Sequence, residues 1–217
     1  PKRAGYRYTF YFDAASSHNF CQRTYTDDGR HDYVLGPRIP GPNVFLDGVS
    51  QRGGTQGPHQ RWATGTLFDN LKLESMIALE HRNGSGSGHS WAGVQSTLWN
   101  TASPSIICDA PAGHLNYAIG NTGNEAQSWY VDNTQAGVYR GYYDSHGTHV
   151  ATRSLYLKQL EDRLGISAVE NIAISEQLEG TIYDMLQAWK GEGAITEYYA
   201  DHLASPVDLS LSDLETE

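Results

Sequence analysis

The run Thr66–Asn70, which reads Thr-Leu-Phe-Asp-Asn, decides the fold because variants of it recur along the chain. Val44–Gly48 and Thr97–Thr101 share its pattern of an apolar pair, then Asp or Asn, then a small or polar residue, and Tyr117–Asn121 is a weaker copy. The longest interval between copies contains the run Gly84–Gly88, so a loop insertion there explains its length. The recurring polar residues are spaced by 22, 31 and 21 positions, and they are Asp47, Asp69, Asn100 and Asn121.

A period in the low twenties, with short apolar runs and an Asn or Asp after each, predicts a parallel solenoid built coil by coil. Asn and Asp suit the corners of such coils because they tolerate left-handed backbone and hydrogen-bond their own turns. We therefore expect an all-β fold of the parallel β-helix type, with those four polar residues stacked at one corner. The alternative is an ordinary β-sandwich in which the spacing is coincidental.

The chain divides into three parts on its pattern. Residues 1–150 are interpreted as β-helix coils with loop insertions, 151–190 as a helical C-terminal cap, and 191–217 as an acidic tail. The alternating aromatic run Tyr6–Phe12 predicts a strand at the start, and Ser128–Val131 predicts another. The cap begins with a helix over Ser154–Leu164, where Ser154 can cap the first turn, and a second helical candidate covers Leu178–Trp189.

Composition limits the function classes. A chain of 217 residues with a formal charge of −10 is most simply one domain, and the charge argues against nucleic acid or an anionic membrane as the main partner. No apolar run approaches the length of a membrane span. Cys21 and Cys108 are the only cysteines, and the sequence leaves open whether they form one disulfide or stay as two thiols.

The first strand raises a question about the start of the stack. The chain begins at Pro1 without an initiator Met and enters the strand Tyr6–Phe12 almost at once, so it is interpreted as processed or partial. The first coil of a parallel stack exposes unpaired backbone groups on its outer side. We therefore expect this end to be covered by a further portion of polypeptide or by another copy of the chain.

Several segments resemble a known family. Gly41–Leu46, Gly57–Gly65, Gly88–Gly93 and Ser154–Leu157 are similar to segments of secreted right-handed parallel β-helix proteins of the pectate-lyase-like superfamily. The resemblance covers roughly Tyr6–Gly165 and corresponds to the later part of such a protein. It implies a right-handed β-helix whose long loops shape a cleft for polysaccharide, and an extracellular location. The superfamily contains lyases, hydrolases and other members, so it bears on the fold more than on the reaction.

Basic and aromatic side chains on loop-like sequence offer the chemistry of β-elimination. That reaction needs a base for the sugar C5 proton, an acid for the leaving oxygen and a cation for the uronate carboxylate. One coil period would bring a residue near position 59 beside one near position 82. A Tyr, or one of the basic groups, would be the acid. The catalytic candidates are His59, Arg61, Arg82 and His89, and the substrate-binding candidates are Trp62, Trp91, Asp69 and His114.

Other interpretations stay open at this point. The same residues could fasten loops to the coils, which would make the chain a non-catalytic module for glycan binding or extracellular assembly. A glycoside hydrolase would need two carboxylates, for which Asp47 and Asp69 are the best-placed pair, although their repeat position favours a structural role. No metal site is predicted: His146–His149 lacks a third ligand, and calcium is kept only as an alternative cofactor. Convergence of the candidates in an open groove would favour an enzyme; burial under loops would favour the module.

Overall fold

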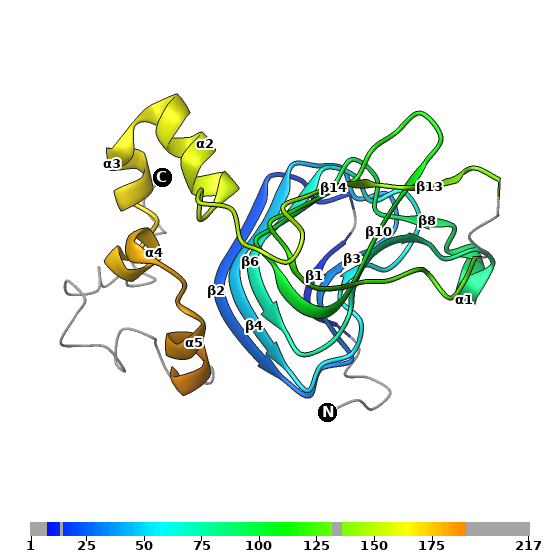
Figure 1. Cartoon of the computed structure of the whole chain (residues 1–217), viewed down its shortest axis with the longest axis horizontal. Coiled ribbons are helices and arrows are strands. Elements are labelled where there is room, and N and C mark those ends of the chain that lie inside the picture. Colours follow the sequence, from blue (N-terminus) through cyan, green and yellow to red (C-terminus); the bar gives the residue numbers. More distant parts are fainter. Residues whose placement is uncertain (1–7, 14, 132–135, 190–217) are drawn as a thin grey trace, which may run out of the picture.

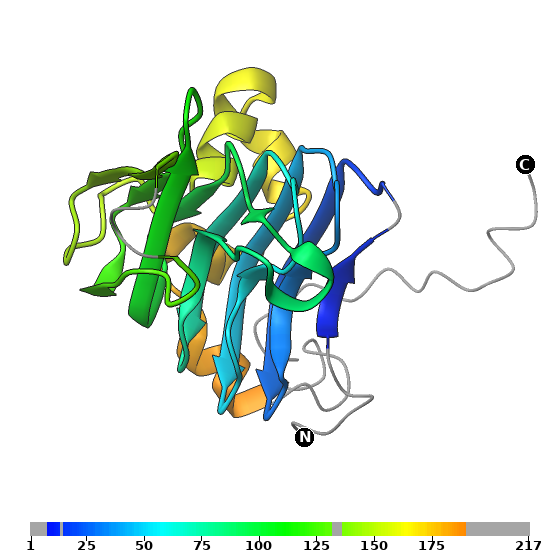
Figure 2. The same ribbon diagram turned by 90° about the vertical axis from the view of Figure 1, so that its right-hand side faces the viewer.

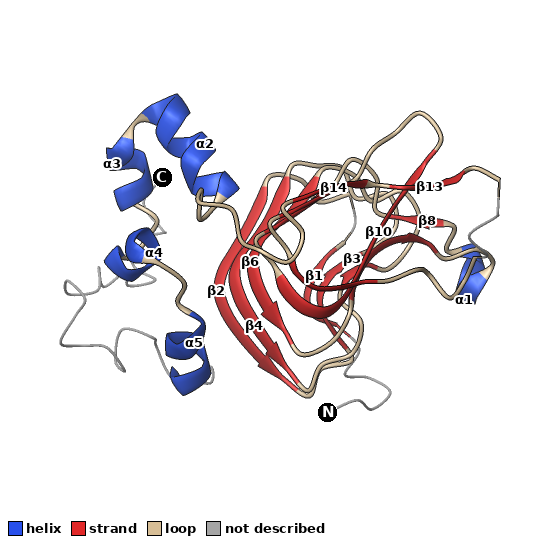
Figure 3. Ribbon diagram, in the orientation of Figure 1, coloured by secondary structure: helices blue, strands red, loops and turns tan. Residues whose placement is uncertain are grey.

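The computed structural model describes residues 8–13, 15–131 and 136–189, which form a stack of parallel coils flanked by short helices (Figures 1 and 3). The strands are β1 Tyr8–Phe12, β2 Asn19–Asp27, β3 His31–Leu35, β4 Asn43–Gln51, β5 Gly57–Pro58, β6 Thr66–Leu73, β7 Ile77–His81, β8 Trp91–Ala92, β9 Thr97–Trp99, β10 Ala102–Pro111, β11 Tyr117–Ile119, β12 Thr122–Glu125, β13 Val138–Arg140 and β14 Tyr142–Asp144. The helices are α1 Ser85–Gly88, α2 Leu155–Leu164, α3 Ile166–Glu170, α4 Ser175–Glu179 and α5 Tyr183–Trp189.

The strands pair in parallel between successive coils, which is the defining feature of a β-helix. One sheet contains β1, β3 and β5, and the neighbouring sheet runs from β2 through β4, β6, β9 and β11 to β14, all with parallel pairing. Figure 2 shows these strands as side-by-side rows. The structure thus confirms the predicted all-β parallel β-helix, with about six coils. The pairs β7–β8 and β10–β13 are antiparallel, and in each of them the chain returns to the stack after a loop.

One corner of the coils is a column of residues in left-handed backbone conformation. Register places one such residue in each coil, with φ between 46° and 66°: Arg23, Asp47, Asn70, Asn100, Gly120 and Ser145. The prediction was right for Asp47 and Asn100 but wrong by one residue for Asp69 and Asn121. Asp69 precedes the corner and faces α2, whereas Asn121 follows it and is fully buried. The Asn121 amide accepts the Thr101 N–H at 2.8 Å and donates to the Leu98 carbonyl at 3.0 Å.

A second column of polar residues lies where the strands of the long sheet begin. Asn43 Oδ1 accepts the backbone N–H of Asn19 at 3.1 Å, and Asn116 Oδ1 accepts that of Ser96 at 2.9 Å. Between them, Ser96 Oγ accepts the N–H of Thr66 at 3.3 Å. Each of these coils thus uses a side chain to satisfy a backbone donor of the coil before it, which offsets the cost of burying polar groups at a bend.

The interior of the coils is filled by apolar and aromatic side chains. The rings of Phe12, Phe45 and Phe68 stack from coil to coil, with centroids 4.5 and 5.5 Å apart. Cys21 and Cys108 both pack against this core as free thiols, so no disulfide joins them.

β1 and β2 pair on one side only within the described residues. The expectation that another polypeptide or another copy covers that end stays a prediction.

The C-terminal helices pack along the flank formed by β2, β4 and β6 (Figure 1). α2 is the helix predicted over Ser154–Leu164: the Ser154 hydroxyl accepts the Leu157 N–H at 3.1 Å, and Leu157 and Leu160 are buried against β4. The second helical prediction is interrupted, because Gly180 ends α4 before α5 begins. The predicted strand Ser128–Val131 is a turn instead. The predicted acidic tail lies outside the described residues.

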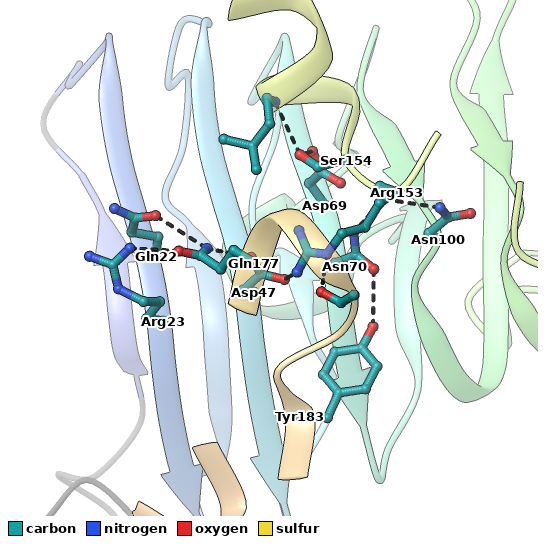
Figure 4. Close-up of polar contacts among 12 residues, drawn as sticks. Gln22, Arg23, Asp47, Asp69, Asn70, Asn100, Arg153, Ser154, Gln177 and Tyr183 are labelled. Carbon is teal, nitrogen blue, oxygen red and sulfur yellow. Dashed lines mark hydrogen bonds and ion pairs between the residues drawn. The ribbon is translucent and has the colours of Figure 1, made fainter. Parts of the chain in front are cut away.

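Buried polar contacts join these helices to the corner column (Figure 4). Arg153 forms an ion pair with Asp47, which also accepts a hydrogen bond of 2.6 Å from Gln177 in α4. Gln177 in turn accepts a hydrogen bond of 2.7 Å from Arg23. Burial raises the pKa of Asp47, and the Arg153 guanidinium opposes that rise. The helical segment is therefore held to the β-helix by charge and hydrogen bonds as well as by apolar packing.

Candidate functional site

His59 and Arg82 lie just past the ends of β5 and β7, which occupy corresponding places in adjacent coils. Arg82 Nη1 donates to His59 Nδ1 at 2.8 Å and to the His59 carbonyl at 2.7 Å. Because a guanidinium can only donate, Nδ1 accepts and the ring proton of neutral His59 is on Nε2. Burial and then the Arg82 charge lower the pKa of His59 to about 3. His59 is thus a neutral donor at physiological pH.

Arg82 also binds Tyr130, which sequence reasoning did not single out. Arg82 Nη2 donates to the Tyr130 hydroxyl at 3.1 Å, and the guanidinium lies 5.1 Å from the centre of the tyrosine ring. Burial acts to raise the pKa of Tyr130, but the hydrogen bond from Arg82 and its charge lower that pKa below its usual value. A phenol whose pKa is lowered in this way is suited to exchanging protons with a substrate.

The segment that carries Tyr130 is fixed by polar contacts rather than by a strand. Ser128 Oγ donates to buried Glu80 at 2.6 Å and accepts the Tyr130 N–H at 3.3 Å. Glu80 Oε1 is 3.7 Å from Arg82 Nε, so one carboxylate faces both the turn and the guanidinium. Burial raises the pKa of Glu80, and Ser128 and Arg82 oppose the rise.

Three histidine rings lie in a row beside this arginine. The His59 ring centre is 4.8 Å from that of His31 and 5.0 Å from that of His89, and the Tyr8 ring is 5.4 Å away on the N-terminal side. Burial lowers the pKa of His31 and of His89. His31 Nε2 and His89 Nδ1 are buried without a hydrogen-bond partner in the described part of the chain. Sequence reasoning missed His31, which lies in a regular strand.

Arg61 serves the loop that covers this row. Arg61 Nη1 donates to the carbonyl of Ser87 at 3.2 Å and to that of Gly88 at 2.6 Å, which fastens the turn of α1. The same loop carries His89, which is only 7% exposed, and it ends where Trp91 packs edge-on against His81 at 5.0 Å. His89 is thus brought to His59 by the insertion that lengthened the sequence repeat.

The remaining candidates lie apart from this cluster. Trp62 is exposed, and its ring is 6.0 Å from that of His114, so these two form a separate surface pair. Trp91 is buried. Asp69 is fully buried and accepts hydrogen bonds from the Ser154 hydroxyl and the Tyr156 N–H, so it serves α2 and its cap. Asp47 is also fully buried, so neither carboxylate of the pair considered for hydrolysis faces solvent.

Metal and membrane features can be stated for the described residues only. Within residues 8–13, 15–131 and 136–189, no group of three or more His, Cys, Asp or Glu side chains is arranged to hold a metal ion. Over the same ranges, no helix is long and apolar enough to cross a membrane.

No protein-family model, curated protein or solved structure matches this chain. The parallel pairing of the strands is therefore what identifies the fold.

Proposed function

We propose that this protein is a polysaccharide lyase that cleaves a uronate-containing glycan by β-elimination, and that it acts outside the cell, as the resemblance to pectate-lyase-like proteins implies. The observation that carries the proposal is the double contact of Arg82, which binds His59 Nδ1 at 2.8 Å and the Tyr130 hydroxyl at 3.1 Å. The guanidinium of Arg82 thus lies between the neutral imidazole of His59 and the phenol of Tyr130, whose pKa is below its usual value.

The proposal gives each of these side chains a role. Arg82 supplies the positive charge that stabilises the uronate carboxylate as the C5 proton leaves. Neutral His59, with its proton on Nε2, donates a hydrogen bond to the same carboxylate. Tyr130 removes the C5 proton as a phenolate and returns a proton to the leaving oxygen, which breaks the C4–O bond and leaves a C4–C5 double bond. His59 is therefore a donor in this scheme rather than the base.

The test is turnover of uronate polysaccharides, followed by the absorbance of the unsaturated sugar. Wild-type protein should generate the signal from at least one of polygalacturonate, alginate and a glycosaminoglycan. Tyr130→Phe keeps the ring over Arg82 but removes the hydroxyl, so turnover should fall by about two powers of ten or more. Tyr139→Phe, an exposed tyrosine on β13, is the matched control and should retain full activity. Undiminished turnover by Tyr130→Phe would refute the assignment.

A second function is favoured by the burial of the cluster. Arg82 is 9% exposed, His89 is 7% exposed and Arg61 is bound to loop carbonyls, as expected for side chains that stabilise a loop. On this alternative the chain is a non-catalytic β-helix module for glycan binding or extracellular assembly. Binding of a uronate polysaccharide with no unsaturated product, on any substrate in the panel, would select it.

A further inference from the structure

A groove of about 430 Å³ lies between α2 and the beginnings of β2, β4, β6 and β9. Its volume is in the range of small-ligand sites, which is about 300–1,000 Å³. The groove shares no residue with the cluster formed by Arg82, Tyr130 and the histidines His31, His59 and His89. It therefore represents a separate candidate binding site.

The groove has an apolar floor and an aromatic wall. Val44 and Leu67 line it from neighbouring strands, and Leu160 lines it from α2. Phe20 and Tyr156 also line it, and their rings stack with centroids 4.6 Å apart, which joins the first coil to the helix. A continuous apolar surface beside a polar rim is the usual composition of a site for a sugar ring, which has C–H faces and hydroxyl edges.

The rim carries polar side chains with unused hydrogen-bonding capacity. Gln95 lies just before β9, and Gln159 and Arg163 lie on α2. All three are exposed, and their side chains have no hydrogen-bond or ion-pair partner within the described residues. Amide groups donate to and accept from hydroxyls, while Arg163 offers a fork of donors for a carboxylate.

The charge of the lining is opposite to that of the whole molecule. The chain has a formal charge of −10, yet none of the residues that line the groove is an Asp or a Glu, and Arg163 supplies a fixed positive charge. The acidic residues of the same helix, Glu161 and Asp162, instead pair with Lys158, which is not part of the lining. An anionic ligand is therefore favoured here over a cationic one.

We propose that this groove binds an acidic oligosaccharide, with a sugar carboxylate on Arg163, hydroxyls on Gln95 and Gln159, and a sugar face against the Phe20–Tyr156 wall. It would hold the glycan independently of any reaction at Arg82. This inference extends the proposed function to a second site, but the groove's chemistry is argued from its own residues.

The experiment is calorimetric titration of the Tyr130→Phe protein, in which turnover is expected to be slowed by about two powers of ten or more, with oligogalacturonate and with a neutral cello-oligosaccharide of equal length. The acidic ligand should bind and the neutral one should bind much more weakly. Arg163→Gln should weaken binding of the acidic ligand about tenfold, the effect of losing one charge-assisted hydrogen bond. Lys158→Gln removes the same charge from the same helix outside the groove, and it should leave the affinity unchanged.

Several outcomes would overturn the proposal. They are equal affinity of Arg163→Gln and the parent protein, equal weakening by Lys158→Gln, equal binding of the neutral oligosaccharide, or no binding at all. Arg163 is exposed, so the variant is expected to keep the thermal transition of the parent, which verifies that it is folded. If wild-type protein releases no unsaturated product but Arg163-dependent binding is observed, the lyase function fails while the groove stands. If wild-type protein releases unsaturated product but Arg163→Gln binds the acidic ligand as well as the parent protein does, the groove proposal fails while the lyase function stands.

Discussion

The Ser154 hydroxyl donates a hydrogen bond of 2.7 Å to the carboxylate of Asp69, a residue with no exposed surface. The Tyr156 N–H donates to the same oxygen at 2.9 Å, so the first turn of α2 begins on a carboxylate of the β-helix. Figure 4 shows Ser154 beside Asp69. Burial raises the pKa of Asp69 to about 7, and these hydrogen bonds oppose the rise. The contact therefore links the docking of the helical segment to pH.

The first prediction concerns the pH dependence of stability. The unfolded carboxyl has a pKa of about 3.9, below its folded pKa of about 7, so its contribution to stability is full below about pH 4 and is lost as the pH rises towards 7. Asp69→Asn keeps an acceptor for Ser154 without the charge. It should reduce this loss by roughly 2 kcal/mol, measured by urea unfolding at pH 5 and 8. Part of the slope should remain, because burial also raises the pKa of Asp109 to about 7.

Asp184→Asn is the matched control, since that side chain is 99% exposed. It should leave the pH dependence unchanged. An Asp69→Asn protein with the same slope as wild type would show that the carboxyl titrates normally.

The second prediction concerns the ion pair between Arg153 and Asp47. Arg153→Gln leaves the fully buried Asp47 without its cation, so the free energy of unfolding should fall by about 3 kcal/mol. The double variant Asp47→Asn/Arg153→Gln removes both charges and should recover most of that loss. Urea unfolding of wild type, both single variants and the double variant completes the cycle. Equal destabilisation by Arg153→Gln and the double variant would show that packing, rather than charge, gives Arg153 its importance.

The third prediction uses the left-handed corner. Gly120→Ala would place a Cβ 2.1 Å from Asn100 Oδ1 and 2.8 Å from the Val150 nitrogen, at a backbone φ of 66°. It should cost more than about 1 kcal/mol. Ser145→Gly at the next coil's corner, with a φ of 50°, should instead give a small gain of about 0.5 kcal/mol. Opposite signs in thermal unfolding are expected, and a loss from Ser145→Gly would contradict the argument.

The corner also shows how far the sequence could be interpreted. The repeat predicted successive coils correctly, because apolar runs at a regular interval in the low twenties are typical of strands that stack one coil on the next. It did not show whether Asp69 or Asn70 occupies the corner, since both are turn-forming residues. Only the strand register determines which of them adopts the left-handed conformation. Arg23 and Ser145 occupy the same corner without any compositional signal. The path of the coil imposes the left-handed conformation at these positions, and packing between neighbouring coils stabilises residues that rarely adopt it in isolation.

The site was predictable to a similar depth. A spacing of one coil placed His59 beside Arg82, as expected, and the structure shows the contact between them. Tyr130 could not be found in this way, because it follows β12 on an irregular turn outside the repeat. The helices give a parallel case: the spacing of Leu157, Leu160 and Leu164 predicted one apolar face. Leu157 and Leu160 are buried against the flank of β4, a location that the spacing could not give, whereas Leu164 at the end of α2 is exposed.

The last prediction concerns the pH profile of the proposed lyase. The pKa of His59 is lowered to about 3, so His59 stays neutral across the whole range from about pH 5 to 9. Burial acts to raise the pKa of Tyr130, but Arg82 lowers it below its usual value of about 10, so the phenolate fraction increases with pH and exceeds that of an ordinary tyrosine. The rate at limiting substrate should therefore increase with pH, without an inflection at the usual histidine pKa of about 6.5.

Arg82→Lys keeps a positive charge but cannot bind His59 and Tyr130 at once. Turnover in that variant should fall, and its alkaline inflection should move to higher pH as Tyr130 loses its partner. A bell-shaped profile centred on an ionisation at about 6.5, unchanged in Arg82→Lys, would instead assign the base to a histidine.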